Sequence, residues 1–491
     1  MIDLEVRREP RERAVRRARE RGIIIPTFAQ MKEPAQIPPA IVERLAAIGL
    51  WDLHPLNLFR ITWKNEPVQR GGGFGGVNTL EFPEELTGVP ARIIALVGKW
   101  FPTGAHKVGA TFGCLVPRLV TGQFDPTFHK AVWPSTGNYC RGGAYDANLL
   151  ACESIAILPQ GMSRERFEWL SQVAGEVIAT PGSESNVWEI FQKCKELQAT
   201  RENVYIFNQF DEPGNHLWHY DVTGHAMADV IEAQGHRGSY AGVVLTSGSA
   251  GTTGCGDFLK QRFPASKLAV SEALQCPTLL ENGFGAHRIE GIGDKHIPWI
   301  HNVRNTDMVM AIDDDDAMAL LRLFNEPLGR QFLVREGVPE PLVEQLDLLG
   351  ISSVANLLSA IKFAKYYELG AGDIVLTVMT DSMELYRTRI AELDALHGPY
   401  AERNAVLDFH ARLRGQGTDH VLELRQADRR RIHQLKYFTW VEQMGRSVEE
   451  LNAQWNDFPG YWERIHEMVP AIDEAIASFN DDVGLLKELS R

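Results

Sequence analysis

Short apolar segments alternate with helix-forming segments between residues 77 and 395. The predicted strands are residues 91–97, 131–133, 154–158, 176–179, 204–207, 241–246 and 374–379. Predicted helices between them include 108–116, 144–151 and 223–234, and Pro117 is expected to end or kink the first, because proline lacks a backbone N–H. Strands that are apolar at nearly every position are typical of parallel sheets buried on both faces. The pattern therefore predicts an α/β fold with parallel-type sheets covered by helices.

The two ends of the chain do not follow this alternation. Residues 1–76 predict an N-terminal arm, with a charged helix at 10–21 and a Pro-rich, then aromatic segment at 26–70 that packs on the body. The run Gly71–Gly76 lacks a Lys-Ser/Thr ending, so it predicts a turn rather than a phosphate loop. No strand pattern follows residue 395, and residues 396–491 predict a helical C-terminal extension.

Composition and charge narrow the class of protein. The chain has 491 residues, of which 44% are hydrophobic, and its formal net charge of −14 argues against broad nucleic-acid binding. No apolar run approaches the roughly 20 residues of a membrane span, and the N-terminus does not look like a secretory signal, so a cytoplasmic protein is expected. The six cysteines form no CxxC pair, which indicates neither a metal site nor a disulfide framework.

Lys107 is the first candidate for chemistry. Its neighbours in the segment 101–109 are mostly apolar or small. Such surroundings desolvate an amine and lower its pKa, as a lysine needs in order to form a Schiff base. Taken alone, Lys107 fits a surface lysine better, because lysines are mostly exposed.

A second candidate follows the predicted strand 241–246. Every residue from Ser247 to Gly254 is Gly, Ser, Ala or Thr. Small residues let the backbone approach a phosphate, which successive N–H groups and a helix N-terminus then bind. The alternative is a tight strand–helix turn without a ligand. The loop matches neither a nucleoside triphosphate loop nor a dinucleotide fingerprint.

A third candidate is the segment Ser135–Asn138, which follows the predicted strand 131–133. The Asn138 amide can donate to a ring hydroxylate, and hydroxyl and backbone N–H groups can hold a carboxylate. Asn138 alone would be read as a turn residue.

In this order, the motifs resemble those of the fold-type II pyridoxal phosphate enzymes. That family includes cysteine synthase, cystathionine β-synthase, threonine dehydratase and the tryptophan synthase β chain. The segments that carry the resemblance are Val77–Leu80, Thr103–Lys107, Ser135–Asn138, Glu290–Gly293, Gly350–Ser353 and Thr380–Ser382. The resemblance implies a cofactor-binding catalytic region at 77–395, with a small lobe at about 112–215 and a large lobe from the remainder.

The resemblance also implies roles for individual residues. Lys107 would be the catalytic lysine that binds pyridoxal 5′-phosphate, Asn138 would donate to the ring hydroxyl, and Ser382 would bond the pyridine nitrogen. The phosphate would be held by Gly248, Ser249, Ala250, Gly251 and Thr252, with His106 as a further contact. The substrate carboxylate would be held by Ser135, Thr136 and Gly137. Arg141 would either read a distal acidic group on the substrate or form a salt bridge at the start of a helix.

The expected activity is β-elimination or β-replacement on a small amino acid through an aminoacrylate intermediate. A neutral Ser382 does not keep the ring nitrogen protonated, so loss of a β-leaving group competes well. Two alternatives stay open: a threonine dehydratase-like ammonia lyase or amino-acid racemase, and a catalytically inactive binding subunit with the same fold. Trp133-Pro134 stand where the tryptophan synthase β chain has an acidic residue, which argues against indole chemistry. Expected partners are a small amino acid and other copies of the chain, in a homodimer or higher homo-oligomer, with no nucleic acid or membrane.

Overall fold

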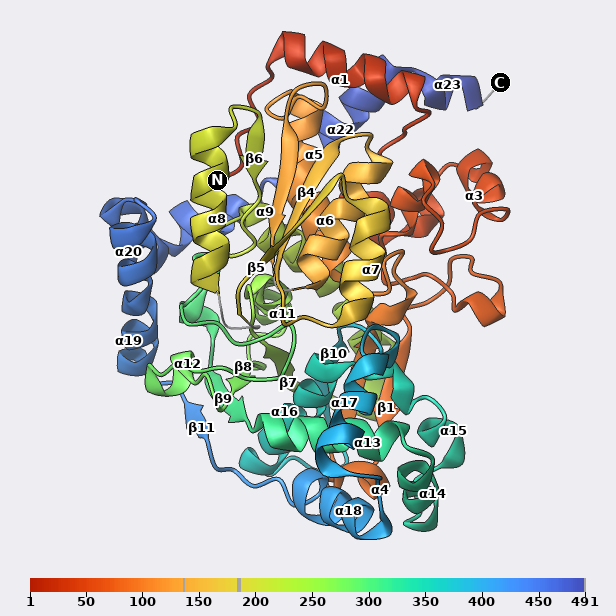
Figure 1. Cartoon of the computed structure of the whole chain (residues 1–491), viewed down its shortest axis with the longest axis vertical. Coiled ribbons are helices and arrows are strands. Elements are labelled where there is room, and N and C mark those ends of the chain that lie inside the picture. Colours follow the sequence, from red (N-terminus) through yellow and green to blue (C-terminus); the bar gives the residue numbers. More distant parts are fainter. Residues whose placement is uncertain (136, 183–186, 490–491) are drawn as a thin grey trace.

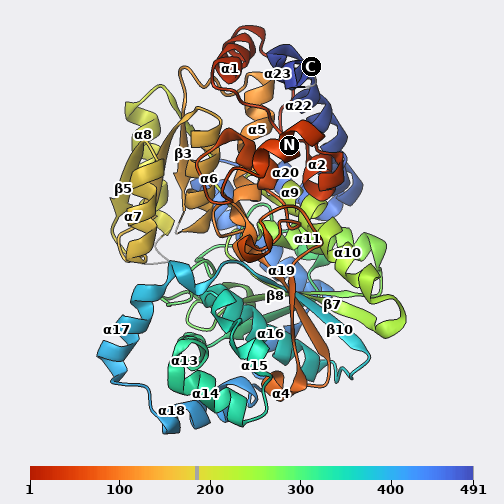
Figure 2. The same ribbon diagram turned by 90° about the vertical axis from the view of Figure 1, so that its right-hand side faces the viewer.

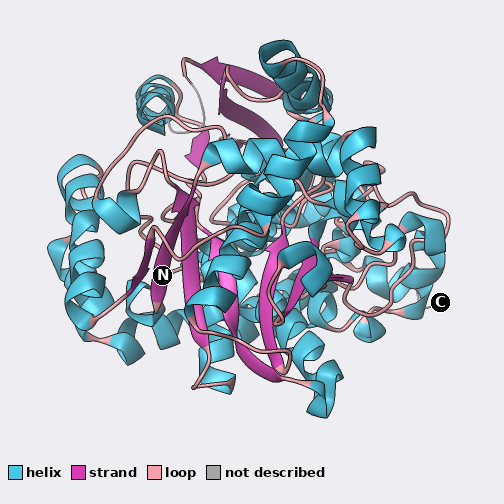
Figure 3. Cartoon of the chain, turned by 90° about the horizontal axis from the view of Figure 1, so that it is seen from below, coloured by secondary structure: helices cyan, strands magenta, loops and turns pink. Residues whose placement is uncertain are grey.

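A seven-stranded sheet forms the larger of two α/β units. The computed structural model describes residues 1–135, 137–182 and 187–489. The strand order is β1-β2-β10-β7-β8-β9-β11, and the five central strands are parallel while β1 and β11 are antiparallel to their neighbours. Figure 3 shows this sheet surrounded by helices. The strands are β1 (Thr79–Phe82), β2 (Arg92–Val97), β7 (Ser239–Thr246), β8 (Lys267–Ala273), β9 (Met308–Ile312), β10 (Asp373–Met379) and β11 (Val421–Glu423).

A second, four-stranded sheet forms the smaller unit. Its order is β5-β4-β3-β6, and all of its strands are parallel. The strands are β3 (Lys130–Pro134), β4 (Glu153–Pro159), β5 (Glu176–Thr180) and β6 (Val204–Ile206). Figure 2 shows this sheet above the larger one. The carboxyl end of β3 leads into the predicted Ser135–Asn138 segment, so the smaller unit supplies part of the candidate site.

Helices cover both sheets. Those before residue 263 are α1 (Arg8–Glu20), α2 (Phe28–Lys32), α3 (Pro39–Leu45), α4 (Glu84–Thr87), α5 (Lys107–Thr121), α6 (Asn138–Leu149), α7 (Arg164–Val173), α8 (Val187–Thr200), α9 (Pro213–Trp218), α10 (Gly224–Gln234) and α11 (Gly254–Arg262). The later ones are α12 (Thr278–Glu281), α13 (Asp314–Asn325), α14 (Pro327–Arg335), α15 (Glu340–Val343), α16 (Ile351–Tyr366), α17 (Arg387–His397), α18 (Glu402–Leu407), α19 (Gln426–Lys436), α20 (Val448–Asn456), α21 (Arg464–His466), α22 (Val469–Val483) and α23 (Leu485–Leu489). Among the described residues, no helix combines the length and apolarity needed to cross a bilayer.

The predicted α/β architecture is confirmed. All seven predicted strands coincide with strands of the structure. The predicted helix 223–234 coincides with α10, and the predicted helix 144–151 overlaps α6, which begins earlier, at Asn138. Strands β8 and β9 were not among the predicted ones, although both are apolar and buried. Strands that are apolar at nearly every position are buried on both faces of the larger sheet, and this pattern is what made the parallel α/β fold predictable.

Two expectations are corrected by the structure. Pro117 does not end its helix, because α5 continues to Thr121, and the alternative of a kink stays a prediction. This helix is buried against α6, α9 and α22, and that packing offsets the roughly 3 kcal/mol that an interior proline costs. The C-terminal extension is also not purely helical, since Val421–Glu423 form β11 and pair with Met308–Met310. A strand of three residues is too short to show an alternating pattern.

The N-terminal and C-terminal segments pack on each other over α5 (Figure 1). The Asn480 side chain donates to the carbonyl of Ile25 at 2.7 Å and accepts from its N–H at 3.0 Å. The Asp473 carboxylate accepts from the N–H groups of Phe28 and Ala29, at 2.7 and 3.1 Å. The arm therefore packs on the other end of the chain as well as directly on the body, where the Trp63 indole donates to the Thr223 hydroxyl at 3.0 Å.

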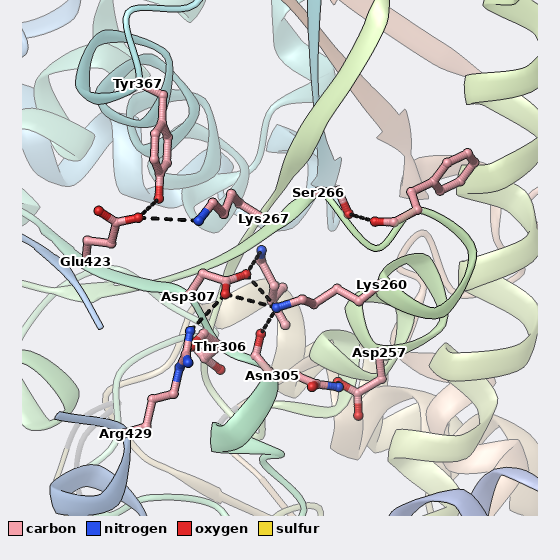
Figure 4. A network of polar contacts seen from close by, with 12 residues as sticks. Asp257, Lys260, Ser266, Lys267, Asn305, Thr306, Asp307, Tyr367, Glu423 and Arg429 are labelled. Atoms are coloured by element: carbon pink, nitrogen blue, oxygen red, sulfur yellow. Dashed lines mark hydrogen bonds and ion pairs between the residues drawn. The ribbon is translucent and has the colours of Figure 1, made fainter. Parts of the chain in front are cut away.

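Asp307, which precedes β9, is one point where the C-terminal extension joins the larger unit (Figure 4). The Asp307 carboxylate accepts from Lys260 on α11 at 2.8 Å and from Arg429 on α19 at 2.9 Å. It also accepts from the backbone N–H of Leu268 at 2.8 Å. One nearly buried carboxylate therefore joins three elements, and its removal leaves two cations without their partner.

We expect Asp307→Ala to lower the free energy of unfolding by about 3–5 kcal/mol, the usual cost of removing one partner of a buried ion pair. Urea unfolding followed by circular dichroism measures this change. The matched control is Glu402→Ala, which removes the exposed Glu402–Arg335 pair. Exposed pairs contribute about 0–1 kcal/mol, so equal losses in the two variants would contradict the role given to Asp307.

Candidate active site

Lys107 is the first residue of α5 and lies at the carboxyl ends of the large-sheet strands. Its Nζ donates to the Ser249 hydroxyl at 2.8 Å. The same hydroxyl accepts from the Asn215 amide on α9 at 3.1 Å. The structure therefore brings together the lysine and the small-residue loop that the sequence singled out separately.

The predicted phosphate loop connects β7 to α11. Ala250 adopts a left-handed conformation with a φ of 59°, and Gly251–Thr253 form a turn of 3₁₀ helix. Within the described part of the chain, no hydrogen bond is made by the amide N–H groups of Gly248, Ser249, Ala250, Gly251 and Thr252. Consecutive unpaired donors ahead of a helix N-terminus form an anion site, so these residues fit a phosphate.

Two glycines of this loop have no room for a side chain. A Cβ at Gly251 would lie 1.9 Å from the Asn215 side chain, and a Cβ at Gly248 would lie 2.6 Å from the carbonyl of Gly291. The loop thus keeps its course only with glycine at both positions.

A cavity lies in front of Lys107 and the loop. Its lining combines residues of both units, from α5, the end of β3, the start of α6 and the turns after β7 and β10. The described lining residues are His106, Lys107, Ser135, Gly137, Asn138, Tyr139, Gln209, Gly248, Ser249, Gly291, Asp294, Ser352 and Thr380. Seven of these were predicted as site residues, which places them in one site.

Asn138 is held by a network that crosses between the two units. Its amide donates to the Asp381 carboxylate at 2.5 Å, and the Tyr386 hydroxyl donates to the same carboxylate at 2.6 Å. Arg166 on α7 donates to the Tyr386 oxygen at 2.7 Å and pairs with Glu290 at 3.2 Å. Burial raises the pKa of the Asp381 carboxyl, and the charge of Arg166 opposes that rise. The network fixes the orientation of the Asn138 side chain.

The carboxylate segment starts at Ser135, at the end of β3. The Ser135 hydroxyl accepts from the N–H of Gly137 at 3.1 Å and from the Gln209 amide at 3.3 Å. A side chain at Gly137 would meet the guanidinium of Arg166. Thr136, which was predicted for the same role, lies outside the described residues.

Arg141 does not form the salt bridge expected as one alternative, as no carboxylate among the described residues pairs with it. It donates to the carbonyl of Thr103 at 2.8 Å, and its guanidinium lies 4.0 Å from the centre of the Trp169 ring. Burial, together with the nearby charge of Arg166, lowers its pKa to about 9. Its role in reading a substrate stays a prediction.

His106 is buried beside the predicted phosphate position. Its Nε2 lies 3.4 Å from the Thr252 hydroxyl, and its Nδ1 lies 3.3 Å from the carbonyl of Thr380. Burial, together with the charge of Lys107, lowers the His106 pKa to about 3. This histidine is therefore neutral near pH 7 and can serve as a hydrogen-bonding group.

Ser382 is buried two residues beyond Thr380 and is absent from the described cavity lining. The hydroxyls of Ser352 and Thr380, which are 2.6 Å apart, line the cavity instead. Ser352 belongs to the motif Gly350–Ser353 and Thr380 to the motif Thr380–Ser382. The sequence therefore singled out both segments, but it did not predict that these two hydroxyls line the cavity. Asp294, Gln209 and Asn215 were missed. Asp294 directly follows the motif Glu290–Gly293, whereas no sequence signal marked Gln209 or Asn215.

The chain is similar to several known proteins. Residues 101–331 match the family model described as "Pyridoxal-phosphate dependent enzyme". The protein named "Probable cysteine synthase" of Bacillus subtilis is 31% identical over 286 residues, covering 58% of this chain and 85% of the relative. The O-acetylserine dependent cystathionine beta-synthase of the same organism is 29% identical over 254 residues, covering 51% and 74%. The fold is similar to the O-acetyl serine sulfhydrylase isoform 3 of Entamoeba histolytica, with a TM-score of 0.56 and 20% identity over 69% of this chain and 94% of that one.

The chain belongs to the pyridoxal phosphate-dependent enzymes of fold type II. Its cofactor is pyridoxal 5′-phosphate. The unpaired amides of residues 248–252 fit the phosphate, and Lys107 lies within reach of the same loop.

We expect Gly251→Val to weaken cofactor retention at least about tenfold, or ~1.4 kcal/mol, because its side chain would displace Asn215 and with it the loop. Cofactor absorbance after dialysis measures the occupancy. The matched control is Gly372→Ala, where an added Cβ meets no atom within 4 Å. Unchanged occupancy in Gly251→Val would show that the loop does not hold the phosphate.

Proposed function

We propose that the protein catalyses β-elimination or β-replacement on a small amino acid. The observation that carries the proposal is the 2.8 Å contact between Lys107 Nζ and Ser249, at the mouth of a loop with five unpaired amides. The names of the relatives, cysteine synthase and O-acetylserine dependent cystathionine beta-synthase, support β-chemistry over other reactions of the family.

Lys107 has two tasks in this proposal. It attaches the cofactor to the protein, and its amine then takes the proton from the substrate Cα, a step that needs a neutral amine. When bound, pyridoxal phosphate supplies the electron-withdrawing ring that makes this proton acidic. The Ser249 hydroxyl, 2.8 Å away, keeps the Lys107 amine at the loop between these tasks.

The remaining predicted residues orient the two ligands. The segment 135–137 holds the substrate carboxylate, and Asn138 donates to the cofactor ring from an orientation set by Asp381. His106 lies beside the phosphate position: its Nδ1–H donates to the Thr380 carbonyl, so its neutral Nε2 accepts from the Thr252 hydroxyl of the loop. For the ring nitrogen we retain Ser382 as the sequence predicts, with Ser352 and Thr380 as the hydroxyls nearer the cavity.

The test combines labelling with turnover. Borohydride reduction of the loaded enzyme, followed by peptide mapping, should place the cofactor on Lys107, and Lys107→Ala should lose the label. The matched control is Lys130→Ala, which should keep it. A label on Lys99 or Lys130 would refute the assignment of Lys107.

Turnover of amino acids with a β-leaving group should give a keto acid and ammonia or, with an added thiol, a β-substituted amino acid. O-Acetyl-L-serine and L-serine are the first substrates to assay. Racemisation of alanine without any β-chemistry, or deamination confined to threonine, would replace the proposal with one of its two rivals.

We further infer a homo-oligomer in the cytoplasm. The six cysteines, which are free and buried, fit a reducing compartment. Light scattering coupled to size-exclusion chromatography measures the number of chains.

A further inference from the structure

Asp294 is a cavity-lining residue that the proposed mechanism does not use. It is the one carboxylic acid among the described residues that line the cavity in front of Lys107. Among the described residues, its carboxylate makes no hydrogen bond or ion pair. The positive charge of Lys107 acts on this carboxyl group. A side chain with no structural partner therefore lies where the substrate must bind.

The backbone around Asp294 is held firmly. The N–H of Gly293 donates to the carbonyl of Ser247 at 2.9 Å, next to the phosphate loop. His287 Nε2 donates to the Gly293 carbonyl at 3.0 Å, and the Thr278 hydroxyl donates to the Asp294 carbonyl at 2.7 Å. Gly293 has a φ of 75°, a conformation that other residues rarely adopt. The turn thus directs one carboxyl group into the cavity.

The protonation of Asp294 suits an exchange of protons at neutral pH. Burial raises the pKa of its carboxyl to about 7, against the opposing charge of Lys107. The other titratable lining residues are His106, with a pKa lowered to about 3 by burial, and Tyr139, whose pKa burial raises far above its usual value. Near pH 7 both of these are neutral, so Asp294 and Lys107 are left as the lining residues that can exchange a proton.

We propose that Asp294 is the general acid and base for the β-substituent, and that the enzyme accepts amino acids whose leaving group must be protonated, such as a β-hydroxyl or β-thiol. The inference rests on the proposed β-chemistry. In elimination, Lys107 takes the Cα proton and the Cβ–O or Cβ–S bond breaks. Its electron pair leaves with the heteroatom, which takes a proton from Asp294.

The proton then returns within the cavity. The Lys107 ammonium gives its proton to the Asp294 carboxylate, which restores both groups, and the released unsaturated product hydrolyses in water to a keto acid and ammonium. In replacement, the Asp294 carboxylate takes the proton of the incoming nucleophile while the nucleophile's electron pair forms the new bond to Cβ. Lys107 then returns the proton to Cα.

The test compares two substrates that yield the same keto acid, pyruvate. Acetate leaves O-acetyl-L-serine without help, whereas hydroxide leaves L-serine only if it is protonated. Asp294→Asn in the holoenzyme should lower kcat/KM for L-serine by about 10²–10⁴-fold, the usual contribution of a general acid, and change that for O-acetyl-L-serine by less than about threefold. Asp294→Glu should recover part of the L-serine activity.

The pH profile supplies a second measurement. In wild type, we divide kcat/KM for L-serine by kcat/KM for O-acetyl-L-serine. This ratio should fall about tenfold per pH unit above the apparent pKa of the acid, since L-serine reacts only when Asp294 is protonated. Asp294→Asn should make the ratio independent of pH. Glu281→Gln, the same carboxyl-to-amide change at an exposed residue, should behave as wild type.

A third measurement does not depend on turnover. Difference infrared spectra of the holoenzyme against pH should contain a titrating carboxylic-acid band that Asp294→Asn removes and Glu281→Gln retains. Equal losses on both substrates, or full L-serine activity in Asp294→Asn, would overturn the role of Asp294 while β-chemistry stands. If wild type converts neither substrate, the β-chemistry is overturned and this inference with it. If wild type converts O-acetyl-L-serine but not L-serine, this inference alone is overturned.

Discussion

Direct contact between the backbones of helices α5 and α9 is the constraint on which the site depends. A side chain at Gly113 on α5 would lie 2.5 Å from the carbonyl of Gly214 on α9, so the helices touch only because glycine stands there. Because the two helices are this close, the Ser249 hydroxyl accepts hydrogen bonds from both of them. One comes from Lys107, six residues before Gly113 on α5, and the other from Asn215 on α9. A wider separation would lose one of these bonds, and with it the alignment of the lysine and the phosphate loop. The buried proline of α5 is tolerated for the same reason, since the packing that the site requires also holds the helix together.

The C-terminal extension supports α9 from the other side. His216, the residue after Asn215, and His466 of the extension have their Nε2 atoms 3.0 Å apart, in rings that are nearly parallel with centres 5.3 Å apart. The two nitrogens therefore point head to head and share one proton. A zinc ion lies about 2.0–2.1 Å from each histidine nitrogen, in the direction of the nitrogen's lone pair. The two lone pairs here point at each other across 3.0 Å, which leaves no room for zinc between the nitrogens. Burial lowers the pKa values of His216 and His466 to about 3 and 2, so the pair is neutral at physiological pH. The extension thereby holds the helix that supports the phosphate loop through a hydrogen bond between two neutral rings.

The sequence predicted those parts of the site whose role is set by the residues next to them in the chain. Lys107 lies among small and apolar residues, and the loop around Ser249 consists of small residues only, so both carry their chemistry in the chain itself. Asn215 and Gln209 act through contacts with segments far along the chain, and neither has neighbours that signal this role. Asp294 is intermediate, because its motif was recognised but its meaning depends on which way the turn faces. The strand at Val421–Glu423 was missed for a similar reason, since its pairing with β9 rather than its composition makes it a strand.

Burial determines which side chains of the cavity carry a charge. Burial leaves His106 and Tyr139 neutral, and it raises the pKa of Asp294 into the range where it can both give and take a proton. A partly buried amine and carboxyl attract each other more strongly than in water, and passing one proton between them neutralises both. Such a pair can hold the proton that leaves Cα until a leaving group needs it. The close contact of α5 with α9 thus determines where Lys107 lies, and the turn at Gly293 places the carboxyl group that can share its proton.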